Sequence, residues 1–297
     1  MVDISYIIIT RNRKDELIKS IKSCFSTTNR SAEIVVVDNG STDGSIEAVK
    51  GLRHPDNFEI NLIESAENLG VAGGRNKGTQ CAKSDLLFFL DDDAVFDRTY
   101  NDVDALIDYF QENMSVAIAA VNIFDDVHQE YQNNEFREAN FDDVVQTFRY
   151  VGAAHMIRKS LIGRENLYPP KFMYGSEESY AALLAHYEQH KVVFYPTIKI
   201  IHHPSLKTRD SAEINHENIM INLFVVKKLL LPNILGCVSN GLFIIRLIRL
   251  KKCKLKEILR CYKISKIRLR ENWNSRVKID VVKCFGLIRK LGLKNII

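Results

Sequence analysis

The chain has 297 residues, of which 46% are hydrophobic and 26% are charged, and its net charge is +4. This composition excludes wholesale disorder and allows one large domain, or one domain with an appendage. The charge is uneven, because residues 246–297 contain 17 Lys and Arg but three Asp and Glu. An acidic body with a basic tail indicates that the tail contacts something anionic.

The first 124 residues alternate between strand patterns and amphipathic helix patterns. Buried strands are expected at Ile4–Thr10, Glu33–Asp38, Asn61–Glu64, Asp85–Leu90 and Val116–Phe124. Helices are expected at Lys14–Phe25, Ser41–Leu52, Gly70–Ala82 and Tyr100–Asn113. Strand alternating with helix predicts an α/β fold with an open, mostly parallel twisted sheet.

The pattern loosens after Asp125, where residues 125–143 are polar and loop-like. Further strands are expected at Phe148–Arg158, Val192–Tyr195 and Ile198–His203, and a helix at Glu177–Gln189. Every pattern from residue 212 onward is helical, which predicts a helical, basic extension over residues 212–297.

The six cysteines form no CxxC pair, which favours free thiols in a reducing compartment over disulfides or a zinc site. The N-terminus enters a strand pattern directly, without the pattern of a signal peptide. Both features favour a cytoplasmic protein.

Polar clusters follow three of the predicted strands. They are Thr10-Arg11-Asn12-Arg13, Asp38-Asn39-Gly40-Ser41-Thr42-Asp43-Gly44 and Asp91-Asp92-Asp93. Ligands of open α/β sheets bind at the carboxyl ends of the strands, so these clusters are expected to converge on one site.

The three adjacent aspartates repel one another unless a cation neutralises them. Alternate residues of an extended segment face the same side, so Asp91 and Asp93 can together bind Mg²⁺ or Mn²⁺ that bridges a diphosphate. The alternative interpretation is a solvated acidic turn or a helix cap. The carboxylate of Asp38 can accept from a nucleobase N–H, and Asn39 and Ser41 can add hydrogen bonds, although Asp-Asn-Gly-Ser is also a common turn sequence.

A glycine-rich segment runs from Asn68 to Gly78. Its small residues, Gly70 and Gly74 among them, would let the backbone approach a ligand, and the following helix N-terminus favours anions. Arg75 could reach a phosphate. The first strand-to-helix turn has no glycine, which excludes a dinucleotide fingerprint.

Taken in order, four segments resemble the family 2 glycosyltransferases, which have the GT-A fold. They are Ile7–Arg13, Val36–Gly44, Asn68–Asn76 and Phe88–Asp93. The resemblance covers about residues 3–205 and is closest to rhamnosyltransferase-like bacterial members that build surface polysaccharides. It implies inverting, metal-dependent transfer of a sugar from a nucleoside diphosphate, UDP or dTDP, to a hydroxyl of a glycan or lipid-linked acceptor.

The resemblance also implies a role for each strand end. The clusters after the first two strands would surround the base and ribose of the donor, and the aspartates would bind the metal. The expected nucleotide-sugar-binding residues are Thr10, Arg11, Asn12, Arg13, Asp38, Asn39, Ser41, Asn68, Gly70, Gly74, Arg75, Asp91 and Asp92. The catalytic domain would cover residues 1–211, with a nucleotide half to about 124 and an acceptor half after it.

The segment Phe172–Glu178 resembles the acidic acceptor-side motif of the family, usually Glu-Asp. By position Glu178 matches the general base, with Glu177 as second candidate; alternatively, both cap the following helix. The family often has an acidic residue two places later, where this chain has Tyr180. This departure leaves open a non-catalytic, nucleotide-binding partner subunit of a membrane complex.

The segment Ile200–Pro204 resembles the family's histidine near the end of the catalytic domain. His202 matches best as the third metal ligand, with His203 second, and an imidazole beside two aspartates suits Mn²⁺. The alternative is a histidine at a strand end that pairs with a carboxylate.

The extension begins with an uncharged run, Leu229–Ile245, that contains Pro232 and is a poor spanning helix. The following residues 242–252 and 281–294 combine apolar and basic residues at helical spacing, which is typical of a helix in an anionic membrane interface. This pattern predicts a peripheral position on the inner face of the cell membrane. Packing on the catalytic domain or in a homodimer stays open, whereas few aromatic residues argue against nucleic acid.

Overall fold

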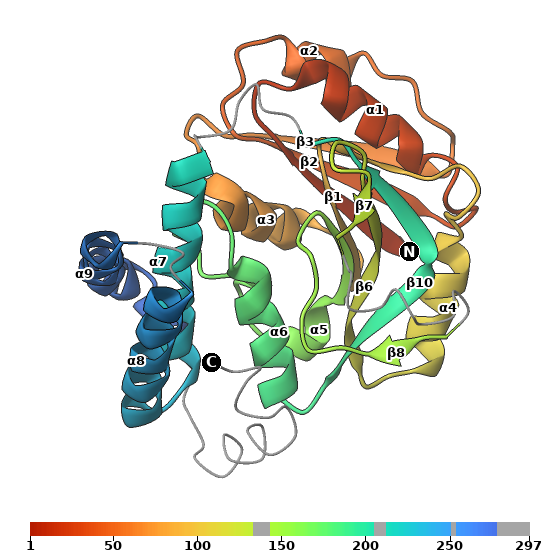
Figure 1. Cartoon of the computed structure of the whole chain (residues 1–297). Helices are drawn as coiled ribbons and strands as arrows, with labels where there is room; N and C mark the ends of the chain where they lie inside the picture. The colour runs from red at the N-terminus through yellow and green to blue at the C-terminus, as the bar shows by residue number, and fades with distance from the viewer. Residues whose placement is uncertain (133–142, 205–211, 251–253, 278–297) are drawn as a thin grey trace.

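The computed structural model describes residues 1–132, 143–204, 212–250 and 254–277 (Figure 1). Residues 278–297 and Lys251 and Lys252, part of the predicted basic membrane segment, lie outside this range, as does most of the loop predicted over 125–143. Within the described residues, no helix is long and apolar enough to cross a membrane.

The first half forms the α/β core that the sequence predicts. Its strands are β1 (Ile4–Thr10), β2 (Ala32–Asp38), β3 (Phe58–Glu64), β4 (Leu86–Asp91), β5 (Ala94–Phe96) and β6 (Val116–Asp125). Its helices are α1 (Lys14–Cys24), α2 (Ser45–Lys50), α3 (Gly70–Cys81) and α4 (Val103–Glu112). The strands β3-β2-β1-β4 are parallel, which confirms the predicted alternation.

The second half completes one sheet of order β3-β2-β1-β4-β9-β6-β10-β5. Its elements are β7 (Glu130–Tyr131), β8 (Val145–Gln146), β9 (Ala154–Arg158), α5 (Lys159–Ile162), α6 (Glu177–Tyr187) and β10 (Lys191–His202). Strand β9 lies antiparallel between β4 and β6, so the sheet is mixed, as in GT-A proteins.

Alternate residues of the central strands face two separate cores. On β1, Ile7 packs with α3 and α6 residues, whereas Tyr6 and Ile8 pack with α1 and α4 residues. Helices therefore cover both faces of the sheet, which explains why these strands read as continuous apolar runs (Figure 1).

Several boundaries differ from the predictions for local physical reasons. Helix α2 begins at Ser45 rather than Ser41, because Gly44 before it has φ +85° and is left-handed. The two strands predicted around Pro196 are one strand, β10, whose register against β6 shifts between Tyr195 and Lys199. Proline has no N–H for a ladder bond, so the sheet accommodates it at this irregularity.

The extension is helical as far as the structure describes it, with α7 (Ala212–Leu230), α8 (Asn233–Arg249), α9 (Leu255–Glu271) and a 3-10 turn (Trp273–Ser275). Val225, Val226 and Leu229 of α7 join the core that contains α3 and α6. Helices α7, α8 and α9 share a smaller core of their own. The first extension helix therefore shares a hydrophobic core with α3 and α6.

Candidate active site

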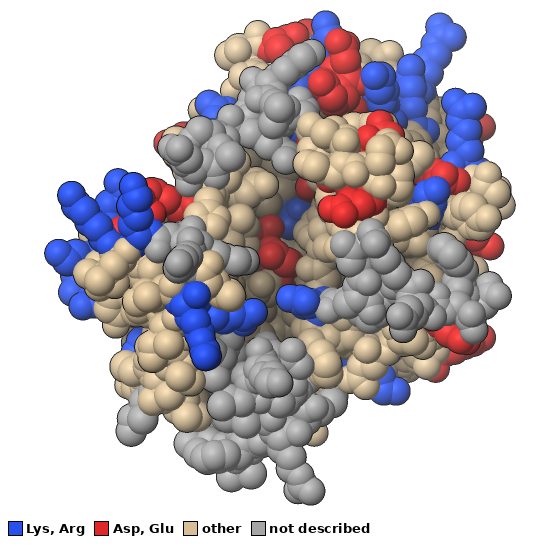
Figure 2. All heavy atoms as spheres, in the orientation of Figure 1, with Lys and Arg blue, Asp and Glu red and all other residues tan. Residues whose placement is uncertain are grey.

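The sheet register brings the polar strand ends together. Thr10 pairs with Asp38 on β2, and Ile9 pairs with Asp91 on β4. A cleft of about 190 Å³ lies at this edge. Its lining residues include Thr10, Arg11, Arg13, Asn39, Asn68, Gly70, Asp91, Asp92, Asp93, Met173, Tyr174 and Asn215. Figure 2 shows a hollow near the centre of the molecule with acidic side chains on its floor.

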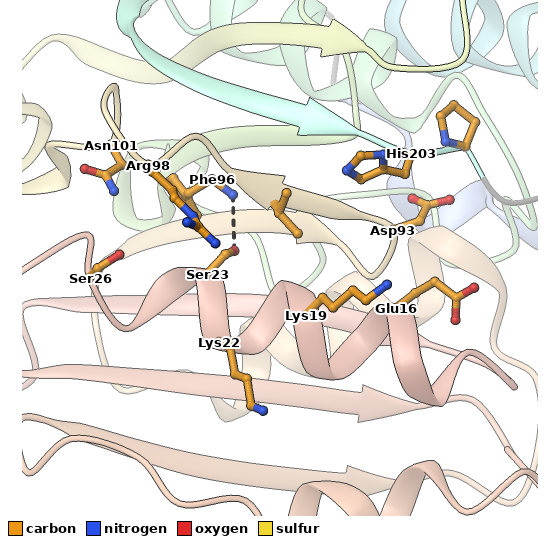
Figure 3. Close-up of a pocket in the computed structure, with 12 residues that line it drawn as sticks. Glu16, Lys19, Lys22, Ser23, Ser26, Asp93, Phe96, Arg98, Asn101 and His203 are labelled. Carbon is orange, nitrogen blue, oxygen red and sulfur yellow. Dashed lines mark hydrogen bonds between the residues drawn. The ribbon is translucent and has the colours of Figure 1, made fainter.

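A larger cavity of about 940 Å³ lies along α1 and β5 (Figure 3). Lys19, Lys22 and Arg98 line it, and it meets the smaller cleft at Asp93. Eight of the thirteen expected nucleotide-sugar-binding residues line the smaller cleft, and none of the thirteen lines the larger cavity. The eight are Thr10, Arg11, Arg13, Asn39, Asn68, Gly70, Asp91 and Asp92. The smaller cleft is therefore the candidate donor site.

Asp91, Asp93 and His202 form a cluster in which one ligand atom of each lies within 4.8 Å of the others. The cluster forms because β5 pairs with β10 in a register that sets His202 opposite Ala94, the residue after Asp93. His202 Nε2 is 3.1 Å from Asp93 Oδ1, and His202 Nδ1 is 3.1 Å from the amide of Gln132. Two carboxylates and an imidazole can hold Mn²⁺ or Mg²⁺.

His203, the second candidate, points to a different carboxylate. Its Nδ1 is 3.0 Å from Asp126 Oδ2, and its side chain is about half exposed. It therefore contributes no ligand atom to the cluster of Asp91, Asp93 and His202.

Asp92 points away from the cluster. Its Oδ2 accepts from the Thr10 hydroxyl at 2.8 Å, and its Oδ1 accepts from Arg13 Nη1 at 2.7 Å. Burial, as the largest cause, raises the pKa of Asp92 to about 7. The positive charge of Arg13 lowers this pKa, and the negative charge of Asp93 raises it further. Thr10 and Arg13 thus hold the aspartate turn in place, and their contact with base or ribose stays a prediction.

Arg75 is buried and makes ion pairs at both ends of its guanidinium group. Nη1 donates to Glu177 Oε1 at 2.8 Å, and Nη2 donates to Asp91 Oδ1 at 2.9 Å and to the carbonyl of Gly152 at 2.8 Å. The expected phosphate contact of Arg75 stays a prediction. In this structure Arg75 links Asp91 of the cluster of Asp91, Asp93 and His202 to Glu177 at the start of α6.

Two side-chain oxygens at the carboxyl end of β2 have no hydrogen-bond donor among the described residues. Asp38 Oδ2 accepts from the backbone N–H groups of Gly40 and Ser41 at 3.1 and 2.9 Å. Asp38 Oδ1 and Asn39 Oδ1 are buried without a hydrogen-bond partner among the described residues. A buried oxygen without a donor is costly, so both atoms suit a ligand that donates N–H or O–H.

Asn12 joins the first two strand ends, because its N–H donates to Ser41 Oγ at 2.9 Å and its Oδ1 accepts from the N–H of Thr42 at 2.7 Å. Asn12 has φ +54°, a conformation that Asn adopts more readily than most residues. Arg11 lines the cleft. The structure therefore brings Arg11, Asn12 and Ser41 to one edge of the sheet, with Asn12 and Ser41 in supporting contacts.

The glycine-rich segment serves two purposes. Asn68 and Gly70 line the cleft, and Asn68 Oδ1 accepts from the N–H of Gly70 at 3.0 Å. Gly74 packs against β1 instead, since an added Cβ would lie 2.8 Å from Ile9. The proposed ligand contact of Gly74 stays a prediction.

The two glutamates of the acceptor-side motif are the first residues of α6 and differ in environment. Glu177 is buried and bonded to Arg75, whereas Glu178 is half-buried. Burial, followed by the negative charge of Glu177, raises the pKa of Glu178 to about 8. A carboxyl group that titrates near neutral pH is suited to general-base chemistry.

Helix α7 supports the loop before these glutamates, a contact that the sequence did not reveal. Asn222 Nδ2 donates to the carbonyls of Tyr174 and Gly175 at 3.0 and 2.8 Å. Ser176 Oγ donates to the carbonyl of Ile219 at 3.2 Å. The available signal was the stripe of Asn215, Asn218 and Asn222 on a mostly apolar helix, and Asn215 lines the donor cleft.

Tyr180, where the family often has an acidic residue, has a structural role here. Its hydroxyl donates to the carbonyl of Ser275 at 2.6 Å and so ties α6 to the last described turn of the extension. Lys171 N–H donates to Asn272 Oδ1 of the same turn at 3.0 Å.

The chain matches known proteins over its first half most clearly. A protein of Haemophilus influenzae described as uncharacterized is 27% identical over 172 residues, which are 56% of this chain and 92% of that protein. A UDP-Glc:alpha-D-GlcNAc-diphosphoundecaprenol beta-1,3-glucosyltransferase of Escherichia coli is 31% identical over 90 residues, 30% of this chain and 35% of the relative. The crystal structure of GalNAc-T7 with UDP, GalNAc and Mn²⁺ superposes with a TM-score of 0.57 at 16% identity, covering 78% of this chain and 49% of the other.

The structural likeness shows a GT-A fold. The family model described as glycosyl transferase family 2 matches residues 5–166, more than half of the chain. This range contains the strand ends Thr10–Arg13, Asp38–Gly44 and Asp91–Asp93 that form the cleft. The chain therefore belongs to glycosyl transferase family 2 and is a glycosyltransferase.

Proposed function

We propose that this glycosyltransferase moves a sugar from a nucleoside diphosphate to an acceptor hydroxyl, with inversion at the anomeric carbon. The observation that carries the proposal is the cluster of Asp91, Asp93 and His202 in the cleft that also contains Asn39. The GT-A relative that was crystallised with UDP, GalNAc and Mn²⁺ supports a nucleotide-sugar donor.

Asp91, Asp93 and His202 would hold Mn²⁺ or Mg²⁺. The surrounding network fits a divalent cation, because the carboxyl groups of four residues, 91, 92, 93 and 177, share two guanidinium groups, Arg13 and Arg75. Such an ion, when bound, neutralises charge on the diphosphate as it leaves.

The donor's base and ribose would lie at the second strand end. The buried Asp38 Oδ1 accepts from the N–H of a uracil or thymine ring, and Asn39 Oδ1 accepts from a ribose hydroxyl or the base. These two acceptor atoms support UDP or dTDP as carrier. The UDP-Glc-dependent relative from Escherichia coli agrees with this choice.

Glu178 would take the proton of the acceptor hydroxyl as its oxygen attacks the anomeric carbon from the side opposite the diphosphate. Glu177 is the weaker candidate because its carboxylate is bonded to Arg75. A single attack of this kind inverts the configuration of that carbon.

We propose a glycan or lipid-linked acceptor in cell-surface polysaccharide synthesis, in the rhamnosyltransferase-like branch of the family. The relative that acts on a diphosphoundecaprenol-linked sugar supports this acceptor class. The site would belong to a catalytic domain over residues 1–211 at the cytoplasmic face of the membrane, with the extension over 212–297.

The proposal is tested by release of nucleoside diphosphate from UDP-, dTDP- and GDP-sugars with Mn²⁺ or Mg²⁺. Asp93→Asn and Glu178→Gln should each abolish turnover, whereas Glu112→Gln on the exposed surface of α4 should not. Full turnover in both site variants would refute the assignment. Nucleotide binding without turnover on any donor and acceptor would instead favour a non-catalytic partner subunit.

A further inference from the structure

Helix α8 packs one side on the rest of the extension, through Leu247 and Phe243 among others, and leaves a second apolar side exposed. Ser239 and Asn240 are buried, and Asn240 Nδ2 donates to the carbonyl of Phe224 on α7 at 3.2 Å. On the opposite side lie four exposed residues, Val238, Leu242, Ile245 and Ile248, with exposed fractions of 39% to 60%. We call these four the α8 stripe. The outward side of a helix at a water-exposed surface is usually polar, so the exposed α8 stripe indicates a binding partner.

The surroundings of the α8 stripe are basic. The sequence has no Asp or Glu between Glu217 and Glu257, and Arg246 and Arg249 are exposed on the last turns of α8. Neighbouring α9 adds exposed Lys256, Lys263, Lys266 and Arg270, together with exposed Leu259 and Ile267. Figure 2 shows Lys and Arg side chains gathered at the left of the molecule, where Figure 1 has α9 and the adjoining end of α8.

We propose that the α8 stripe inserts into the headgroup region of an anionic lipid bilayer. The apolar side chains enter the interface, and the long Arg and Lys side chains reach the lipid phosphates from its edge. The sequence predicts only that the basic tail meets a membrane; the structure assigns the inserted residues and the helix that carries them. This surface is remote in sequence from the donor residues and does not rest on their chemistry.

The charge distribution favours a bilayer over a second copy of the chain. In a two-fold dimer the same patch meets itself, so Arg246 and Arg249 of both copies would face one another. Like charges at such a contact oppose association, whereas anionic headgroups attract each Lys and Arg near the surface.

The experiment is sedimentation of the full chain with phosphatidylcholine vesicles, with and without phosphatidylglycerol, in the absence of donor. We expect binding to the anionic vesicles that weakens as salt is added, and little binding to the neutral ones. Leu242→Asp and Ile245→Asp should each weaken binding about tenfold, because each removes an inserted apolar side chain. Thermal midpoints of the variants confirm that they fold.

Met114→Asp and Val127→Asp are the matched controls. Both residues are exposed apolar side chains, 65% and 63%, outside the extension. They should bind vesicles as the unchanged protein does. Equal binding by the stripe variants and the controls would overturn the proposal. So would stripe variants that lose a concentration-dependent dimer in sedimentation velocity, because the stripe would then contact a second copy. Donor hydrolysis plays no part in these readouts, so failure of the proposed function leaves them unaffected.

Discussion

Asn222 offers a sharp test of how the extension serves the reaction. Its side chain is fully buried on α7 and donates to two carbonyls of the loop that leads to Glu178. Leu is close to Asn in size but donates no hydrogen bond. Asn222→Leu therefore removes both loop contacts while it keeps the helix packed.

The expected effect follows from the two lost bonds to the loop. The substitution also removes the bond that Asn222 Oδ1 accepts from Arg268 Nη1 at 3.1 Å, and the Asn218→Leu control likewise loses a bond from Arg268. One hydrogen bond contributes about 1 kcal/mol net, so the loop loses roughly 2 kcal/mol of support. If the whole loss raises the activation free energy of the reaction, kcat falls about thirtyfold. If part of the loss lowers the stability of the whole protein instead, kcat falls about three- to thirtyfold. The pH dependence of the reaction should shift as well, because Glu178 moves relative to Glu177.

The assay measures kcat, KM for the donor, the pH profile and the thermal midpoint. Asn218→Leu is the matched control, since Asn218 on the same helix accepts from Arg268 at 2.9 Å but contacts neither loop carbonyl. A lowered midpoint with unchanged kcat and pH profile would refute the positioning role of Asn222. An equal loss of kcat in both variants would refute it too.

Three further outcomes follow from the site. Because the pKa of Glu178 is raised to about 8, the carboxyl is protonated below that pH and cannot accept a proton, so kcat/KM should rise as pH increases through about 8; a flat profile contradicts this. Arg75→Met leaves the buried Glu177 and the partly buried Asp91 without their cation and should lower stability by ~3–5 kcal/mol in thermal unfolding, far more than Arg30→Met at a partly exposed pair. His202→Ala should weaken Mn²⁺ binding in calorimetry about tenfold or more, while His203→Ala should not; equal effects would exclude His202 as the ligand.

The central sheet was predictable because its strands are buried on both faces. The run Ile4–Thr10 is typical of a strand buried on both faces, and the polar residues that follow it mark where the strand ends. The antiparallel insertion of β9 was not predictable, since Arg158 pairs with Leu86, more than seventy residues earlier. Periodicity reports which face a residue occupies and says nothing about its partner strand.

The residues of the site were found more easily than their contacts. An arginine after a glycine-rich turn fits a phosphate and a carboxylate equally well, and the fold gives Arg75 two carboxylates. Asn222 carries no motif, and its importance depends on how α7 packs beside residues 174–176. Such contacts join segments far apart in the chain, so local sequence patterns cannot disclose them.

The side chains of the adjacent aspartates point toward different partners. Asp91 and Asp93 join His202, whereas Asp92 between them faces Thr10 and Arg13.

Glu177 and Glu178 also differ in environment, because Arg75 pairs with Glu177, whereas burial and the charge of Glu177 raise the pKa of Glu178. Two neighbouring carboxyl groups with different environments can take different roles, one fixed as a charge and one free to exchange a proton. By pairing with Glu177, Arg75 therefore favours Glu178 over Glu177 as the proposed base.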